Sequence, residues 1–297
     1  MDWTSFTECF LDSCRARGRA LLTVATYRAD LNAFGAWYEE STGAAPDPIA
    51  ITSLDVAEYR SWLHRRWKPA TTNRRLAVVK AAFTWAAGEG LVTASPAAQV
   101  RPVAAERPGP RSVDGRTLSA LLREAQRAGS ARDVALITLL CQTGLRIAEA
   151  LALRWSDLTI RERSGVVVVR KGKGARYREV PLSLTARRAL ETWRKTRWPD
   201  QTPAQDAPVF PGRAGAHPLT SRAAQQAFAR YVRRAGLQLA VTPHTLRHTF
   251  AKRLVDEGVS LDRVAALAGH ASLSTTARYT RPTAADLEQA VSKLDWV

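Results

Sequence analysis

A proline-rich segment divides this 297-residue chain into two parts with different patterns. The stretch at 101–111 contains three prolines and a glycine and few apolar side chains. Proline has no backbone N–H and restricts the residue before it, so neither a helix nor a central strand continues through such a stretch. The sequence therefore predicts two domains, 1–105 and 106–297, joined by an extended linker.

Apolar residues of the first part recur at helical spacing in four segments. The expected helices are Thr4–Ala16, Val24–Glu40, Leu54–Arg65 and Thr72–Ala87. Thr52, followed three residues later by Asp55, is typical of a capping box at the start of the third helix. Since no strand pattern appears here, we expect a small bundle of four helices.

The second part mixes helical segments with one short strand pair. The expected helices are Gly115–Arg127, Arg132–Thr143, Ile147–Trp155, Leu184–Trp198, Ser221–Ala235, Pro243–Asp256, Leu261–Ala268, Thr275–Tyr279 and Ala284–Leu294. The four valines at 166–169 are followed, across a glycine-containing turn, by a second extended segment at 176–181, which predicts a hairpin. The fold class is therefore mainly α with a small β-sheet, an α+β arrangement.

Basic side chains are concentrated in the second part. Residues 1–105 contain 12 basic and 10 acidic side chains, a net charge of +2, whereas residues 106–297 contain 32 and 17, a net charge of +15. Arginine predominates, and its planar guanidinium suits phosphate groups. This balance favours a nucleic acid partner, although a protein from an arginine-rich, GC-biased genome would show the same composition.

Several classes of protein are excluded. The longest apolar run, Val134 to Cys141, is eight residues and too short to span a bilayer, and the N-terminus lacks the blocks of a signal peptide. Three scattered cysteines form no disulfide framework, and no Cys/His cluster has zinc spacing. We therefore expect a cytoplasmic protein with no membrane partner.

Two pairs of residues have the spacing of one helical turn, and the first of these pairs suits a phosphate group. His244 and Arg247 share one face at the start of an expected helix, beside the positive end of its dipole. Arg146 follows Gly144 at the start of another, and Glu149, three residues on, can brace it. Each pair also has a simpler interpretation, namely exposed side chains at a helix start or an ordinary surface ion pair.

Two further residues follow the expected helix that ends near Gly269. His270 comes directly after that glycine, and Tyr279 follows nine residues later. Taken singly, His270 is explained as a polar residue at a helix end and Tyr279 as a half-buried aromatic.

The order and spacing of all these motifs together resemble the tyrosine recombinase family, most closely the Xer recombinases and related phage and integron integrases. The resemblance is carried by Arg146, a Gly-Lys-Gly hairpin at Lys173, His244-x-x-Arg247, Gly269-His270 and Tyr279. It covers nearly the whole chain and implies an N-terminal SAM-like core-binding domain followed by a catalytic domain. The departures, at Ala148, Ala268 and Arg281, remove no group that the chemistry needs.

The resemblance implies site-specific cleavage and rejoining of DNA through a 3′-phosphotyrosine intermediate, without metal, ATP or other cofactor. Tyr279 is then the nucleophile. Arg146, Arg247 and His244 stabilise the charge that develops at phosphorus.

A lysine on the hairpin is implied as the general acid that protonates the departing 5′-oxygen. Lys173 occupies the Gly-Lys-Gly position that carries the family's lysine, and Lys171, two residues away, is the competing candidate. His270 is expected to bind the phosphate or to orient the nucleophile.

Contacts with double-stranded DNA are expected outside the catalytic set as well. The candidates are Arg74, Arg75 and Lys80 on the fourth helix, Lys171 on the hairpin and Arg222 on a later helix. For any single one of them, a solvated charged face is an equal explanation.

The segment Ala284–Leu294 carries an apolar stripe. Self-docking of this segment is one explanation of the stripe. The resemblance implies instead a helix exchanged between protomers of a tetramer on two DNA sites. A second recombinase or an accessory protein as an additional partner stays open.

Two other functions compete with a recombinase. A type IB topoisomerase uses similar chemistry, but the four-helix N-terminal domain and the apolar tail argue against it. A non-catalytic DNA-binding protein has no need of Tyr279 or Lys173. The motifs leave open the DNA sequence and the role among dimer resolution, integration and transposon resolution.

Overall fold

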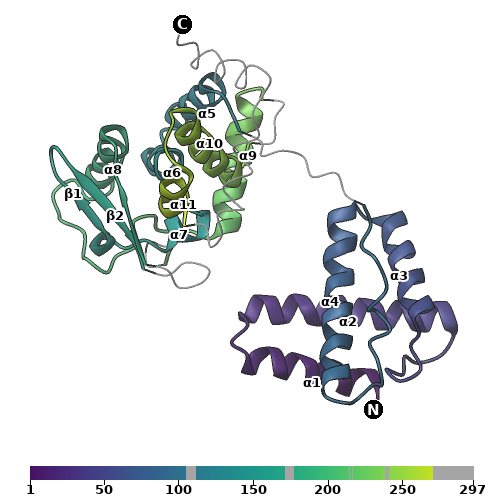
Figure 1. The fold of residues 1–297 in the computed structure, drawn as a ribbon. Coiled ribbons are helices and arrows are strands. Elements are labelled where there is room, and N and C mark those ends of the chain that lie inside the picture. The colour runs from purple at the N-terminus through teal and green to yellow at the C-terminus, as the bar shows by residue number, and fades with distance from the viewer. Residues whose placement is uncertain (105–111, 171–176, 214, 216, 238–240, 270–297) are drawn as a thin grey trace, which may run out of the picture. The chain divides into compact units, whose positions relative to one another are not determined.

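The structure is a computed structural model that describes residues 1–104, 112–170, 177–213, 215, 217–237 and 241–269. The chain forms two compact units, Met1–Arg107 and Pro108–Val297, so the division falls within the proline-rich segment and two residues from the predicted boundary (Figure 1). None of the helices in the described ranges is long and apolar enough to cross a membrane.

The first unit consists of four helices. They are α1 (Trp3–Ala16), α2 (Leu21–Thr42), α3 (Ser53–Arg66) and α4 (Pro69–Gly88). The predicted capping box is present: the Asp55 N–H donates to Thr52 Oγ1 at 3.3 Å, and the Thr52 N–H donates to Asp55 Oδ2 at 2.7 Å. The fourth helix starts three residues before its predicted start because Pro69 occupies its first turn, where a missing N–H costs nothing.

Aromatic rings fill the core of this unit. Phe34 is fully buried and meets Tyr59 edge to face, with ring centroids 4.9 Å apart. Trp3 of α1 lies against α2, where its indole Nε1 donates to the Leu31 carbonyl at 3.2 Å. A Cβ at Gly35 would lie 2.5 Å from that same Nε1, so the close packing of α1 on α2 requires glycine at this position.

The second unit is a helical assembly with a small sheet at one side (Figure 1). Its helices are α5 (Gly115–Arg127), α6 (Ala131–Thr143), α7 (Ile147–Ala152), the 3₁₀ helix η1 (Trp155–Asp157), α8 (Leu184–Arg197), α9 (Ser221–Arg234), α10 (Pro243–Asp256) and α11 (Leu261–Ala268). Helix α6 is apolar on most sides and packs against α5, α8 and α10. It therefore forms the centre of this unit's core.

The sheet has three antiparallel strands in the order β1 (Leu158–Ile160), β2 (Gly165–Val169) and β3 (Arg178–Pro181). The hairpin predicted from the valine run is confirmed, with Val169 opposite Arg178 and Val167 opposite Val180. The first strand was not predicted. It is only three residues long, and its pairing with β2 rather than any pattern of its own defines it.

The predicted helix Ile147–Trp155 is too long. Helix α7 ends at Ala152, and Leu153 is extended. The following residues pair with a distant segment instead, because the Trp155 N–H donates to the Ala207 carbonyl at 3.1 Å and the Leu153 carbonyl accepts from Val209 at 2.9 Å. The helices predicted at Thr275–Tyr279 and Ala284–Leu294 lie outside the described residues.

Replacing Gly35 by alanine is expected to destabilise the first unit by about 1–3 kcal/mol, because the added methyl overpacks the contact with Trp3. Alanine is otherwise the better helix former by about 1 kcal/mol. Gly88→Ala is the matched control, since a Cβ there meets nothing within 4 Å. Urea unfolding of the full chain measures both. A Gly35→Ala protein as stable as the control would contradict the packing described.

Candidate active site

The turn between α6 and α7 brings the site together. Helix α6 ends at Thr143, and the C-cap residue Gly144 has a left-handed φ of 63°. A Cβ there would collide with the ring of Phe250 on α10. Both the backbone conformation and the space therefore require glycine. The last turn of α6 is also stabilised by a side chain, because Thr143 Oγ1 donates to the Leu139 carbonyl at 2.6 Å.

Arg247 reaches this turn from α10. The helix starts as predicted, with Thr242 as N-cap and Pro243 in the first turn. Arg247 is only 4% exposed, and its Nη1 donates to the Gly144 carbonyl at 2.6 Å. The interpretation of Arg247 as an exposed residue at a helix start is therefore wrong, whereas His244 is exposed.

His244 lies beside a second histidine that the sequence analysis did not single out. The Nε2 atoms of His244 and His248 are 2.9 Å apart and the ring centroids 4.2 Å apart. One ring must donate and the other accept, so the pair constrains the tautomers of both. The i,i+4 spacing within one helix is the sequence signal for this contact.

Arg146 is the N-cap residue of α7, and Glu149 braces it as the spacing suggested. The Arg146 N–H donates to Glu149 Oε2 and its Nη1 to Oε1, both at 2.8 Å. The Arg146 Nη2 donates to the Gly269 carbonyl at 3.1 Å, which joins α7 to the end of α11. The Arg146 side chain is 35% exposed but that of Glu149 only 4%, so this is not a surface ion pair.

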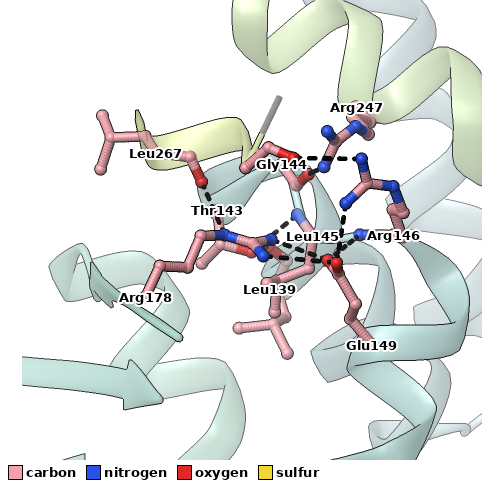
Figure 2. Close-up of polar contacts among 10 residues, drawn as sticks. Leu139, Thr143, Gly144, Leu145, Arg146, Glu149, Arg178, Arg247 and Leu267 are labelled. Carbon is pink, nitrogen blue, oxygen red and sulfur yellow. Dashed lines mark hydrogen bonds and ion pairs between the residues drawn. The ribbon is translucent and has the colours of Figure 1, made fainter. Parts of the chain in front are cut away.

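Sequence reasoning missed Arg178, the first residue of β3. Figure 2 shows Arg146 and Arg178 reaching Glu149 from different elements. Arg178 Nη2 donates to Glu149 Oε2 at 2.7 Å, and its Nε donates to the Leu267 carbonyl at 3.1 Å. A single arginine at a strand end carries no distinctive signal, and only the fold brings it to Glu149.

The ionisation of Glu149 is set by opposing influences. Burial is the largest of them and favours the neutral acid, but hydrogen bonds from the Arg178 side chain and the Arg146 backbone and side chain outweigh it. Together they hold the pKa of Glu149 below its usual value. The carboxylate is therefore ionised at neutral pH.

The predicted DNA contacts on α4 also bind partners within their own unit. Arg74 and Arg75 both approach the buried Asp30 carboxylate of α2: Arg74 Nη2 donates to Oδ1 at 3.0 Å, and Arg75 Nε lies 3.7 Å from the same oxygen. Lys80 Nζ donates to the Val100 carbonyl at 2.9 Å. These three residues therefore do not form one free basic cluster.

Arg222 lies on the solvent side of α9. Ala224, Ala227, Phe228 and Tyr231 form the buried face of α9. The exposed side carries Arg222, Arg230, Arg233 and Arg234. This helix thus presents a basic stripe.

The remaining candidates, Lys171, Lys173, His270 and Tyr279, lie outside the described residues. Of the predicted catalytic set, the structure brings together Arg146, which lies on the α6–α7 turn, and Arg247, whose side chain binds that turn from α10. His244 lies one helical turn before Arg247. Within the described ranges no three His, Cys, Asp or Glu side chains are grouped so as to hold a metal ion.

Comparison with known proteins decides the family. Residues 111–286 match the phage integrase family, and residues 9–90 match the phage integrase N-terminal SAM-like domain. The chain is 36% identical over 275 residues to a tyrosine recombinase XerC of Rhodospirillum centenum, covering 89% of this chain and 78% of that one. It is 35% identical over 268 residues to a XerC of Xanthomonas axonopodis pv. citri, covering 87% and 85%. The chain belongs to the phage integrase family.

Solved structures of other tyrosine recombinases have the same fold. The XerH site-specific recombinase bound to its difH substrate superposes with a TM-score of 0.73 at 24% identity, over 97% of this chain and 85% of that one. A lambda integrase dimer bound to a core site gives 0.74 at 20% identity, over 93% and 97%. This member of the phage integrase family is thus a tyrosine recombinase, an enzyme that breaks and rejoins DNA strands, and the resemblance stated from the motifs is confirmed.

The depressed pKa of Glu149 makes the stability of this recombinase depend on pH. Between the folded-state and the unfolded-state pKa of Glu149, the unfolded chain binds more protons than the folded one. The contribution of Glu149 to the free energy of unfolding is therefore complete above the unfolded-state pKa of about 4.3. It is lost as the pH falls through the folded-state pKa. The stability difference between wild type and Glu149→Gln is therefore expected to shrink as the pH falls below about 4.3.

Urea unfolding of the full chain from neutral to acid pH measures this difference. Glu191→Gln is the control, because Glu191 pairs with Arg194 in a partly exposed ion pair and its loss should change stability little. A Glu149→Gln difference that stays constant with pH would contradict the assigned ionisation.

Proposed function

We propose that this chain is a site-specific recombinase that acts on paired double-stranded DNA sites, with Arg146, Arg247 and His244 binding the scissile phosphate and Tyr279 as the nucleophile. The observation that carries the proposal is the anchoring of two arginines on one turn. Arg247 Nη1 binds the Gly144 carbonyl at 2.6 Å, and Arg146 follows two residues later. Two guanidinium groups held at one turn suit a phosphate whose charge increases in the transition state.

The reaction follows from these groups. The Tyr279 hydroxyl loses its proton to the surrounding site and bonds to phosphorus as the bond to the 5′-oxygen breaks, which leaves a 3′-phosphotyrosine. Lys173 supplies the proton that the departing 5′-oxygen needs, with Lys171 as the competing donor. Attack of a free 5′-hydroxyl on the phosphotyrosine reverses every step, so the strands rejoin without an external energy source.

Assembly and location follow from the same function. We expect four protomers on two DNA sites, with the apolar stripe of Ala284–Leu294 docking on a neighbouring protomer and closing a ring. Arg74, Arg75, Lys80, Lys171 and Arg222 remain proposed DNA contacts, and the exposed basic stripe of α9 supports Arg222 most directly. The expected compartment is the cytoplasm, on the nucleoid.

Tyr279→Phe is expected to bind DNA normally and to form no covalent adduct, because it lacks the attacking oxygen. A nicked suicide substrate, which lets the cleaved 5′ fragment diffuse away, traps the adduct for detection on a denaturing gel. Tyr177→Phe is the matched control, since Tyr177 is an exposed tyrosine of the same unit and should retain adduct formation. A protease-sensitive adduct with Tyr279→Phe would show that another residue is the nucleophile.

Strand exchange and supercoil relaxation are then compared on intact sites. Exchange supports the recombinase, whereas relaxation without exchange would indicate a topoisomerase instead.

Lys173→Ala is expected to cleave ordinary DNA about 10²–10⁴-fold more slowly, the usual contribution of a general acid. A substrate with sulfur in place of the bridging 5′-oxygen has a leaving group that needs no proton, and it should restore most of the rate. Parallel measurement of Lys171→Ala decides between the two lysines. Equal defects of Lys173→Ala on both substrates would exclude it as the acid.

A further inference from the structure

Arg178 is buried between two elements of the site and binds both at once. Its side chain is 9% exposed. Nη2 and Nη1 donate to Glu149 Oε2 and Oε1 at 2.7 and 3.3 Å, and Nε donates in another direction, to the Leu267 carbonyl at 3.1 Å. One rigid guanidinium thus joins β3 to α7 and to the last turn of α11.

These contacts form part of a closed circuit that includes Arg146. Glu149 accepts from Arg178 and also from the Arg146 N–H and Nη1. Arg146 Nη2 in turn donates to the Gly269 carbonyl, two residues beyond the Leu267 carbonyl that Arg178 binds. Both arginines therefore bind the same carboxylate and the same turn, so a shift of one is transmitted to the other.

Gly269 provides an independent sign that Arg178 is packed tightly against this turn. Its φ is 66°, and a Cβ there would lie 2.7 Å from Arg178 Nη1 and 2.8 Å from Cζ. The guanidinium therefore occupies the space that a side chain at 269 would need. Helix α11 and strand β3 are packed together at this point.

We propose that Arg178 is a positioning residue for Arg146: by holding Glu149 and the Leu267–Gly269 turn at a fixed separation, it orients the Arg146 guanidinium toward the phosphate. The proposal rests on the proposed function of Arg146. Arg178 itself is buried and needs no contact with DNA. Its role depends on shape as well as charge, because the planar guanidinium donates from Nη1 and Nη2 to the carboxylate while Nε, on another side of the group, donates to a separate carbonyl.

The competing explanation is that Arg178 only neutralises Glu149 and so stabilises the fold. The two explanations differ for Arg178→Lys. A lysine keeps the positive charge beside Glu149 but is a single ammonium centre, which cannot reproduce the three contacts. A stabilising role predicts nearly normal catalysis for the folded lysine variant, whereas a positioning role predicts slow cleavage.

The experiment measures single-turnover cleavage by Arg178→Lys on suicide DNA, next to Arg146→Ala and Arg187→Lys. Arg187 is the matched control because it also donates to two carbonyls in this unit, those of Leu182 and Glu162, without touching the site. We expect Arg178→Lys to cleave about 10- to 100-fold more slowly than wild type, as a misplacement of about 1 Å can cause. Arg187→Lys should cleave at the wild-type rate, and all three variants should bind DNA.

A methylphosphonate at the scissile position adds a readout that a folding defect does not change. It replaces one charged oxygen by methyl, so less charge remains for Arg146 to balance. The defects of Arg146→Ala and Arg178→Lys should both be smaller on this DNA, and Arg178→Lys should add little to Arg146→Ala in the double variant. Thermal unfolding confirms that each protein is folded, and Arg178→Gln replaces the lysine variant if that one does not fold.

The outcomes separate the two proposals. Wild-type cleavage by Arg178→Lys, or an equal loss on both substrates, overturns the positioning role even if Arg146→Ala is slow. Wild-type cleavage by Arg146→Ala instead overturns the proposed function of Arg146 itself.

Discussion

The site of the second unit depends on a buried carboxylate that has two arginine partners. Removing a carboxylate from water costs several kcal/mol unless opposite charge and hydrogen bonds replace the solvent. Glu149 meets this requirement with Arg146 from the α6–α7 turn and Arg178 from the sheet. Two segments that are distant in sequence, 146–149 and the start of β3, therefore converge on one carboxylate, and the two cations exceed the single anion by one positive charge.

Arg247, the second arginine of the predicted catalytic set, is held in a different way. Among the residues that the structure describes, Arg247 binds a neutral carbonyl, that of Gly144. A carbonyl orients a guanidinium but cancels none of its formal charge, so an arginine anchored in this way stays attractive to an anion. The requirement for glycine at position 144 follows from the same packing, because Phe250 fills the space beside it.

Much of the fold and of the candidate site could be predicted from the sequence. The features that could not be predicted have a common cause. The helices were predictable because their spacing and caps are local, as the Thr52–Asp55 box and the Thr242–Pro243 start illustrate. Arg146, Glu149, His244 and Arg247 were found because they lie within two short motifs. Arg178 and the strand Leu158–Ile160 were missed because each is defined by partners far along the chain. The early end of α7 has the same origin, since pairing of 153–155 with 207–209 overrides a continuous helical pattern.

The buried Asp30 of the first unit affects how the arginines of α4 can meet an anion. Its carboxylate already orients Arg74 and Arg75, which would otherwise sample many rotamers in water. Any phosphate that approaches Arg74 has to compete with a fixed anion for the same guanidinium. A DNA phosphate at the proposed contact with Arg74 shares the guanidinium with Asp30, so this contact releases fewer counterions than one with a free arginine would. This arrangement favours a DNA backbone whose phosphates fit the fixed orientation of Arg74, and it disfavours non-specific binding to other polyanions.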